Sequence, residues 1–323
     1  MHDPHELAGQ AARSGPIFVV FNVGSGHRDA DEEKTSISRI LREGGRDFEF
    51  LQSDGAESID TLAARAVTQA QARHGVVVAA GGDGTINAVA NAVIGSGCPF
   101  GVLPQGTFNY FGRDNAISQD STKAAQVLLG GRISAVQAGR VNGRLFLVNA
   151  SVGLYPQILE DREAWKRQLG RSRIVAFLSG MATLLKARRQ LRLQIESGSQ
   201  SMSLRTPTLF IGNNRLQLTQ AGIDAQHAEA VAQGQLTAVA VRPIGTLALF
   251  GLLLRGMLGR LGEAGHIQSF SFRRLTVVPR GLRRIKVATD GEIVWMTTPL
   301  VFQVAPEPLL LLVPANADQA AIE

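Results

Sequence analysis

The chain has 323 residues, enough for two domains that each bury a core, and its 45% apolar content is ordinary for a folded protein. The first fifteen residues carry Asp3, Glu6 and Arg13 without an apolar run, and no later stretch reaches the roughly 20 apolar residues of a membrane span. Cys98 is the single cysteine, which excludes an internal disulfide and a cysteine-based metal site. We therefore expect a cytoplasmic protein without a secretory signal or a membrane-spanning helix.

The net charge of +6 is distributed unevenly. Residues 1–138 hold 11 Lys/Arg against 15 Asp/Glu, a net of −4, whereas residues 139–323 hold 22 against 12, a net of +10. A basic second half indicates an anionic partner, either a membrane or a nucleic acid. Charge alone does not choose between the two.

Short apolar runs alternate with helical patterns in the first half of the chain. Strands are predicted at residues 17–21, 48–51, 76–80 and 100–103, and helices at 31–43, 58–73 and 85–94. Strands and helices in strict turn predict a parallel sheet covered on both faces. Such sheets bind ligands at the carboxyl ends of their strands.

The pattern changes near residue 138 to short alternating runs separated by Gly and Asn. Strands are predicted at Val141, 145–148, 191–195, 209–211, 236–241, 275–278 and 285–288, with helical insertions at about 157–190 and 245–261. We therefore expect an α/β domain over 1–138, followed by an antiparallel β-sandwich domain over 139–323. The closing runs at about 300–314 are strands that could return to the first domain.

Three of the predicted parallel strands end in polar, glycine-bearing loops. The strand at 76–80 leads into Gly81, Gly82, Asp83, Gly84, Thr85 and a helix. The strand at 100–103 leads into residues 104–109, Pro-Gln-Gly-Thr-Phe-Asn, and the strand at 17–21 leads into residues 22–26, Asn-Val-Gly-Ser-Gly.

Glycines at a strand-to-helix junction let backbone amides approach a polyphosphate, and Asp83 is a suitable ligand for Mg²⁺. Taken alone, one such junction is as well explained by a tight turn with Asp as a helix cap. Three loops meeting at one sheet edge favour a phosphate site.

The two motifs Gly-Gly-Asp-Gly-Thr-Ile-Asn at 81–87 and Leu-Pro-Gln-Gly-Thr-Phe-Asn at 103–109 resemble the signature pair of the diacylglycerol kinase catalytic-domain family, which includes sphingosine and ceramide kinases. The loop at 22–26 resembles the family's Asn-Pro-x-Ser-Gly loop, with Val23 in place of the proline. The resemblance continues through residues 148–153 and ends in Asp290-Gly291-Glu292. It therefore covers nearly the whole chain.

The resemblance implies an amino-terminal nucleotide-binding domain similar to NAD kinases and diacylglycerol kinases, a β-rich second domain, and an active site in the cleft between them. ATP and Mg²⁺ are the implied cofactors, with Asp83 as metal ligand and Asp83 and Glu292 as the catalytic acids. A carboxylate such as Glu292 can accept the proton of an attacking lipid hydroxyl. The expected nucleotide-binding residues are Asn22, Ser25, Gly26, Gly81, Gly82, Gly84, Thr85, Asn87, Gly106, Thr107 and Asn109.

The sequence departs from the family pattern at several positions. Gln137, Ala138 and Gly139 stand where members commonly carry Asp-Leu-Gly, and residues 233–237 read Gln-Gly-Gln-Leu-Thr where many have Asp-Gly-Leu-Leu-Asp. Tyr110 replaces a frequent Asp and Ala88 a frequent Glu. Thr237 and Gln137 leave the family's structural metal site in doubt. Taken without the resemblance, Glu292 is an ordinary solvated residue beside a hairpin turn.

Basic residues lie among apolar ones in two segments of the second half. Residues 162–192 hold nine Lys/Arg against one acid, and residues 273–286 hold six Lys/Arg. Such segments suit an anionic bilayer, although a solvated helix explains the first equally well. The chain has 6% aromatic residues and no recognised nucleic-acid-binding motif, so we do not expect nucleic acid as the partner.

The leading hypothesis is therefore an ATP-dependent lipid kinase, peripheral to the inner face of the membrane, that acts on a diacylglycerol-like lipid. One alternative is a soluble NAD kinase-like or sugar kinase-like phosphotransferase, because those families share Gly-Gly-Asp-Gly-Thr. Another is a nucleotide-binding regulator without turnover. The identity of the lipid and the oligomeric state, with a homodimer as one option, stay open.

Overall fold

The computed structural model describes residues 4–22, 27–52, 57–153, 156, 190–198, 200–243 and 265–316. The chain forms two compact units, Met1–Gln137 with Pro306–Glu323, and Ala138–Ala305. The helical insertions expected at about 157–190 and 245–261 lie, except for Gln190, outside the described residues.

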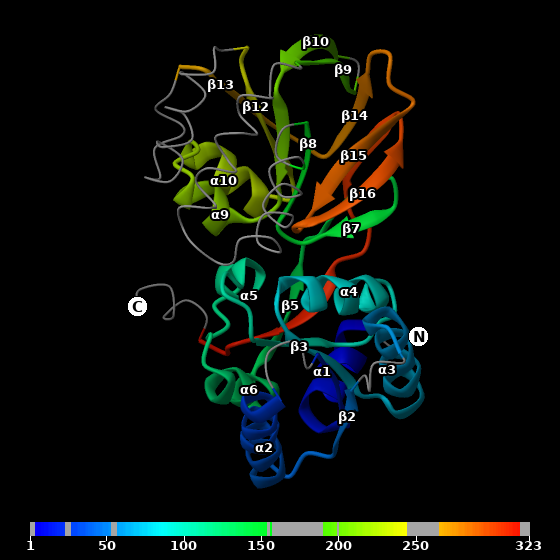
Figure 1. Ribbon diagram of the computed structural model, residues 1–323. Coiled ribbons are helices and arrows are strands. Elements are labelled where there is room, and N and C mark those ends of the chain that lie inside the picture. The colour runs from blue at the N-terminus through cyan, green and yellow to red at the C-terminus, as the bar shows by residue number, and fades with distance from the viewer. Residues whose placement is uncertain are drawn as a thin grey trace. The chain divides into compact units, whose positions relative to one another are not determined.

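The first unit is an α/β unit built on a six-stranded sheet (Figure 1). Its strands are β1 (Ile17–Phe21), β2 (Phe48–Gln52), β3 (Val76–Gly81), β4 (Phe100–Pro104), β5 (Arg132–Val136) and β18 (Leu309–Val313). The sheet order is β2-β1-β3-β4-β18-β5, and only the β18–β5 pair is antiparallel. The predicted parallel sheet is confirmed. β1, β3 and β4 are wholly buried, as their unbroken apolar runs require.

Helices cover both faces of this sheet (Figure 1). The helices are α1 (Pro4–Ser14), α2 (His27–Glu43), α3 (Ile59–Arg73), α4 (Asp83–Val93), α5 (Tyr110–Asp114) and α6 (Ser121–Gly130). α3 packs against α4 on one face, and α2 packs against α6 on the other. α3 begins where Ser58 Oγ accepts the backbone N–H of Thr61 at 3.2 Å. Within this unit, the sequence analysis missed α1, α5, α6 and β5.

The second unit is the expected antiparallel β-sandwich. One sheet has the order β10-β9-β14-β17-β6-β7 and the other β13-β12-β11-β8-β15-β16. The strands are β6 (Gly139–Val141), β7 (Arg144–Phe146), β8 (Asn149–Gly153), β9 (Leu191–Ser197), β10 (Gln200–Thr206), β11 (Thr208–Gly212), β12 (Leu236–Val241), β13 (Ile267–Phe272), β14 (Arg274–Pro279), β15 (Arg284–Thr289), β16 (Glu292–Thr297) and β17 (Leu300–Val304).

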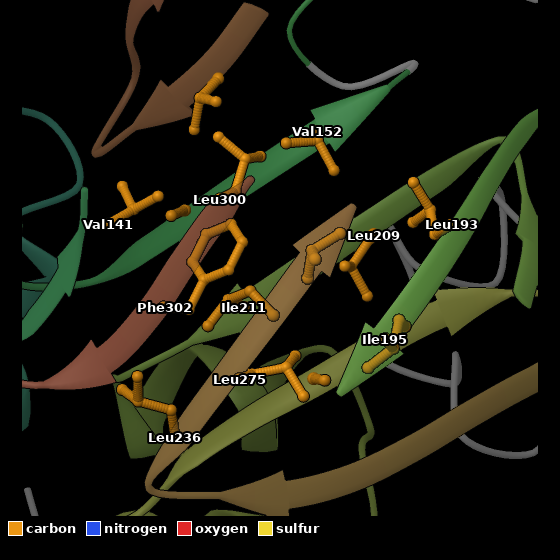
Figure 2. Packing of buried hydrophobic residues seen from close by; sticks show 14 of the residues in the cluster. Val141, Val152, Leu193, Ile195, Leu209, Ile211, Leu236, Leu275, Leu300 and Phe302 are labelled. Carbon is orange, nitrogen blue, oxygen red and sulfur yellow. The ribbon is translucent and has the colours of Figure 1, made fainter. Parts of the chain in front are cut away.

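Alternate residues of both sheets form one apolar core (Figure 2). Val152, Leu209 and Ile211 come from one sheet and meet Leu275 and Phe302 from the other. The helices α9 (Arg215–Gln220) and α10 (Ala225–Ala232) form a smaller cluster with β12, in which Leu218, Val231 and Val239 are buried. The alternation of buried core residues along the strands fixes the register in which neighbouring strands pair.

The two closing strands lie in different units. β17 pairs with β14 and β6 inside the sandwich. β18 instead joins the first sheet, where Leu311 lies opposite Phe100 of β4 and the whole strand pairs with β5. The chain thus leaves the first unit after Gln137 and re-enters it at Pro306.

Candidate functional site

The junction of β3 and α4 leaves the first amides of a helix available. Gly82 occupies the cap position of α4, and no side chain caps this end of the helix. A Cβ on Gly81 would lie 2.7 Å from Cβ and Oγ1 of Thr85, so the tight turn requires glycine there. Uncapped N–H groups at a helix amino terminus attract anions.

Asp83 is the first residue of α4, and one of its carboxylate oxygens already accepts a hydrogen bond. Oδ2 accepts the backbone N–H of Asn109 at 3.2 Å, and the backbone N–H of Tyr110 also bonds this carboxylate. Oδ1 is buried and has no hydrogen-bond partner among the described residues. Burial raises the pKa of Asp83, although the two backbone hydrogen bonds oppose the shift.

An unpartnered buried carboxylate oxygen fits a divalent cation, which needs only one or two protein carboxylates when phosphates and waters supply the other ligands. The described residues hold no cluster of three or more His, Cys, Asp or Glu that could bind a metal by themselves. A metal at Asp83 would therefore need oxygen atoms from a bound ligand.

The loop after β4 is held by its own asparagine and lies against the first loop. Asn109 Oδ1 accepts the N–H of Gly106 at 2.9 Å, and Asn109 Nδ2 donates to the Gly106 carbonyl at 2.7 Å. The N–H of Gln105 donates to the Gly81 carbonyl at 2.9 Å. Asn109 is buried and has a φ of 46°, a conformation that asparagine tolerates well. Its side chain thus shapes the loop, while Thr107 and Phe108 are exposed.

The end of β1 joins the same site. Asn22 Nδ2 donates to Thr85 Oγ1 at 2.9 Å, which links the loop after β1 to α4. Thr85 is buried, and Gly84 and Asn87 lie half-buried on α4. The predicted meeting of three loops is therefore found for Asn22, Gly81–Asn87 and Gln105–Asn109. Ser25 and Gly26 lie outside the described residues.

Asp290 and Glu292 lie in the second unit, at the β15–β16 hairpin. Asp290 and Gly291 both have positive φ, and Thr289 lies opposite Glu292, so the turn is the two-residue hairpin that Asp-Gly favours. Glu292 Oε2 accepts from Arg144 at 2.5 Å, with 59% of the Glu292 side chain exposed. Arg144 Nε also donates to Thr289 Oγ1 at 2.9 Å.

Asp290 has a role that the sequence analysis did not assign. Its Oδ2 accepts the N–H of Leu147 at 2.7 Å, and its Oδ1 accepts the N–H groups of Val148 and Asn149, both at 2.9 Å. These three residues form the passage from β7 in one sheet to β8 in the other. No local sequence signal relates positions about 140 residues apart, so only the fold reveals this clamp.

We predict that Asp290→Asn lowers the free energy of unfolding by about 2 to 3 kcal/mol, because an amide group would face one of the backbone N–H donors. Asparagine also tolerates a positive φ, so the change tests the carboxylate rather than the turn. Urea unfolding measures the effect. Glu292→Gln is the control and should cost about 1 kcal/mol or less, as exposed ion pairs do. Equal unfolding midpoints for Asp290→Asn and the wild type would contradict this role.

Two of the positions that depart from the family pattern, Thr237 and Tyr110, have structural partners here. The Thr237 hydroxyl donates to the His227 carbonyl at 2.9 Å and lies 3.2 Å from Ser271 Oγ. The Tyr110 ring stacks on Phe108, with the ring centroids 6.0 Å apart. Thr237 therefore takes part in a buried hydrogen-bond network.

The fold and site together define the class: an α/β unit with three polar loops at one sheet edge, followed by an antiparallel β-sandwich. Residues 16–141 match the diacylglycerol kinase catalytic domain, which confirms the resemblance predicted from the motifs at 81–87 and 103–109. This matched segment contains all of the described loop residues.

The chain is also similar to individual proteins, and its fold is similar to that of solved structures. A Staphylococcus saprophyticus diacylglycerol kinase is 29% identical over 142 residues, 43% of this chain and 46% of that protein. An uncharacterized Synechocystis protein is 29% identical over 256 residues, 74% of this chain and 55% of that protein. The chain thus matches about half the length of these relatives. The crystal structure of a candidate diacylglycerol kinase from Bacillus anthracis has a TM-score of 0.70 at 18% identity and covers 93% of this chain and 97% of that one.

Proposed function

We propose that the protein is a lipid kinase that transfers the γ-phosphate of ATP to a lipid hydroxyl, with a diacylglycerol-like lipid as acceptor. The observation that carries this proposal is the unpartnered Oδ1 of Asp83 beside the uncapped end of α4, where three loops meet. The catalytic-domain match and the names of the staphylococcal relatives support the kinase class.

Backbone amides and small polar side chains would hold the nucleotide. The amides at the start of α4 and the glycines at 81, 82, 84 and 106 offer close backbone approach to phosphates. Asn22, Ser25, Gly26, Thr85, Asn87 and Thr107 complete the proposed set. Asn109 would act through the loop that it shapes, because its side-chain amide already bonds Gly106.

Asp83 would hold Mg²⁺ through Oδ1, and the bound ion would neutralise charge on the β and γ phosphates. Glu292 would accept the proton of the lipid hydroxyl. Its ion pair with Arg144 holds the carboxylate at the start of β16. Asp290 is not available for this task, because both of its oxygens accept backbone N–H groups.

The site of action would be the inner face of an anionic membrane, with the segments 162–192 and 273–286 as basic contacts. Among the described residues, no helix is long and apolar enough to cross a membrane. In the part of the first segment that is described, Arg192 is exposed on β9. In the second segment, all the basic residues except Lys286 are exposed.

A phosphate-transfer assay tests the proposal. Radiolabelled ATP is offered with diacylglycerol, monoacylglycerol, phosphatidylglycerol, a sphingoid base and NAD, each with and without Mg²⁺. Label in a lipid product supports the proposal and identifies the lipid. Label in NAD alone would assign a soluble NAD kinase-like enzyme, and ATP binding without any product would assign a regulator.

We predict that Gly106→Ala weakens ATP–Mg²⁺ binding by about ten-fold or more. The added methyl would lie 2.7 Å from Asn109 Oδ1 and 3.0 Å from the Gly82 Cα, so the two loops must separate. Calorimetric titration with a non-hydrolysable ATP analogue measures the change. Gly130→Ala is the matched control, because no atom lies within 4 Å of its added Cβ. Equal affinities in the two variants would contradict a nucleotide site between these loops.

A further inference from the structure

One face of the β15–β16 hairpin combines an exposed tryptophan with cations. Trp295 on the edge strand β16 is 57% exposed. Lys286 lies directly opposite it on β15, with Nζ 5.3 Å from the ring centroid, and the Arg284 guanidinium lies 5.9 Å from that centroid. The connection between β14 and β15 adds exposed Arg280 and Arg283, with Leu282 at 42% exposure. We call these six residues the Trp295 surface.

Strand alternation fixes the direction of these side chains. Ile285 and Val287 of β15 and Met296 of β16 are buried in the sandwich core, so their neighbours Arg284, Lys286 and Trp295 point outward. The adjoining connection is also held in place: Thr298 donates its N–H to the Arg283 carbonyl at 3.1 Å and its hydroxyl to the Leu282 carbonyl at 2.8 Å. The surface is therefore formed by paired strands and a hydrogen-bonded connection.

The charge of this surface has one sign. Residues 280–288 contain four Lys/Arg and no Asp or Glu. Glu292 is the one acidic residue on strands β8, β15 and β16. It lies at the other end of the hairpin and pairs with Arg144. Trp295 and Leu282 add exposed apolar side chains to this basic surface, and an aromatic side chain among cations suits a membrane interface.

We propose that the Trp295 surface is a docking site for an anionic lipid bilayer, with Trp295 and Leu282 inserted at the headgroup level. Tryptophan favours this interface because its ring is apolar and its N–H remains hydrated, while the basic side chains contact acidic headgroups. A second copy of this chain would bring an identical set of cations against these, which opposes self-association. Nucleic acid would satisfy the cations but leave Leu282 without an apolar environment.

This inference deepens the proposed function, since a lipid kinase needs its catalytic site at the membrane, but binding can be measured without turnover. Trp165 and Trp295 are the only tryptophans in the chain, so Trp165→Phe leaves Trp295 as the single fluorescent reporter. Vesicles of phosphatidylcholine with phosphatidylglycerol should shift its emission to the blue, and brominated lipid should quench it. Vesicles of phosphatidylcholine alone should do neither.

Variants measured by vesicle sedimentation locate the contact. Trp295→Ala should weaken binding by about ten-fold. Arg283→Gln with Arg284→Gln should weaken it by about 30-fold at low salt, at roughly five-fold for each cation. Arg39→Gln with Arg65→Gln is the matched control, because it removes the same charge from exposed positions of the first unit. It should change binding by less than three-fold, which we take as roughly the effect of net charge alone.

Three results would overturn the proposal: vesicle binding without a change in Trp295 emission, equal losses in the two arginine pairs, or a blue shift that follows protein concentration without vesicles. The last result would assign the surface to self-association. Turnover on a short-chain diacylglycerol dissolved without vesicles keeps the two proposals apart. Absence of this turnover would contradict the proposed kinase activity. The vesicle measurements would still test the docking site.

Discussion

Asp83→Asn is expected to reduce phosphate transfer by a factor on the order of 10³ or more, since a metal ion supplies several kcal/mol of transition-state charge stabilisation and Asp83 is its proposed ligand. Asparagine retains an oxygen that can accept the Asn109 N–H, so the loop should keep its structure. Turnover is measured with the preferred lipid of the panel. Asp60→Asn, at an exposed position in the first turn of α3, is the matched control and should be fully active.

The same substitution should stabilise the protein without ligand. Because burial raises the pKa of Asp83 in the folded state, the folded state binds its proton more tightly than the unfolded chain. Its ionisation therefore lowers stability as pH rises from the unfolded to the folded pKa, and the loss is complete above the folded value.

Asp83→Asn should accordingly raise Tm by a few degrees at neutral pH and leave it unchanged below the ordinary pKa of an aspartate. Thermal unfolding at pH 7 and at low pH measures both. Retained turnover would reject Asp83 as the metal ligand. A lower Tm at neutral pH would reject the unfavourable burial of its charge.

Glu292→Gln is expected to keep ATP affinity and to lose turnover by a factor on the order of 10² to 10⁴, because a glutamine cannot accept the hydroxyl proton. Glutamine can still accept the hydrogen bond from Arg144, so the hairpin should remain intact. ATP-analogue titration and steady-state kinetics separate the two effects.

Arg144→Gln tests whether loss of the Arg144–Glu292 ion pair by itself lowers turnover. It removes the partner but leaves the Glu292 carboxylate, so turnover should fall by less than about ten-fold if Glu292 is the base. Equal losses in Arg144→Gln and Glu292→Gln would mean that the pair matters only for structure. Full activity of Glu292→Gln would leave the residue as an ordinary solvated neighbour of the turn.

The sequence predictions that agree with the structure are those that rest on strong local signals. The runs at 17–21, 76–80 and 100–103 match β1, β3 and β4 to within one residue, because a strand buried on both faces must be continuously apolar. Glycine and asparagine mark where those strands end, which located the three loops. The Asp-Gly turn before Glu292 was predictable for the same reason, since only a few residues accept positive φ at two successive positions.

Other features depend on partners distant in the chain. Residues 300–304 and 309–313 are both short apolar runs, yet β17 joins the sandwich and β18 joins the first sheet. The difference depends on the strands with which each run can pair. The side-chain amide of Asn109 bonds the backbone of Gly106, a contact that the motif alone does not reveal. The short helices α5 and α9 were missed because five or six residues carry too little periodicity to detect.

The sequence by itself determined the parallel α/β unit, the change to a sandwich near residue 138, and the three loops with Asp83, because burial, periodicity and backbone conformation are properties of neighbouring residues. Only the tertiary structure decided that Asp83 has one committed and one unpartnered oxygen, that Asp290 holds residues 147–149, and that Trp295 points to solvent beside Lys286. Each of these depends on strand register and on hydrogen bonds between distant segments, which a local pattern does not encode.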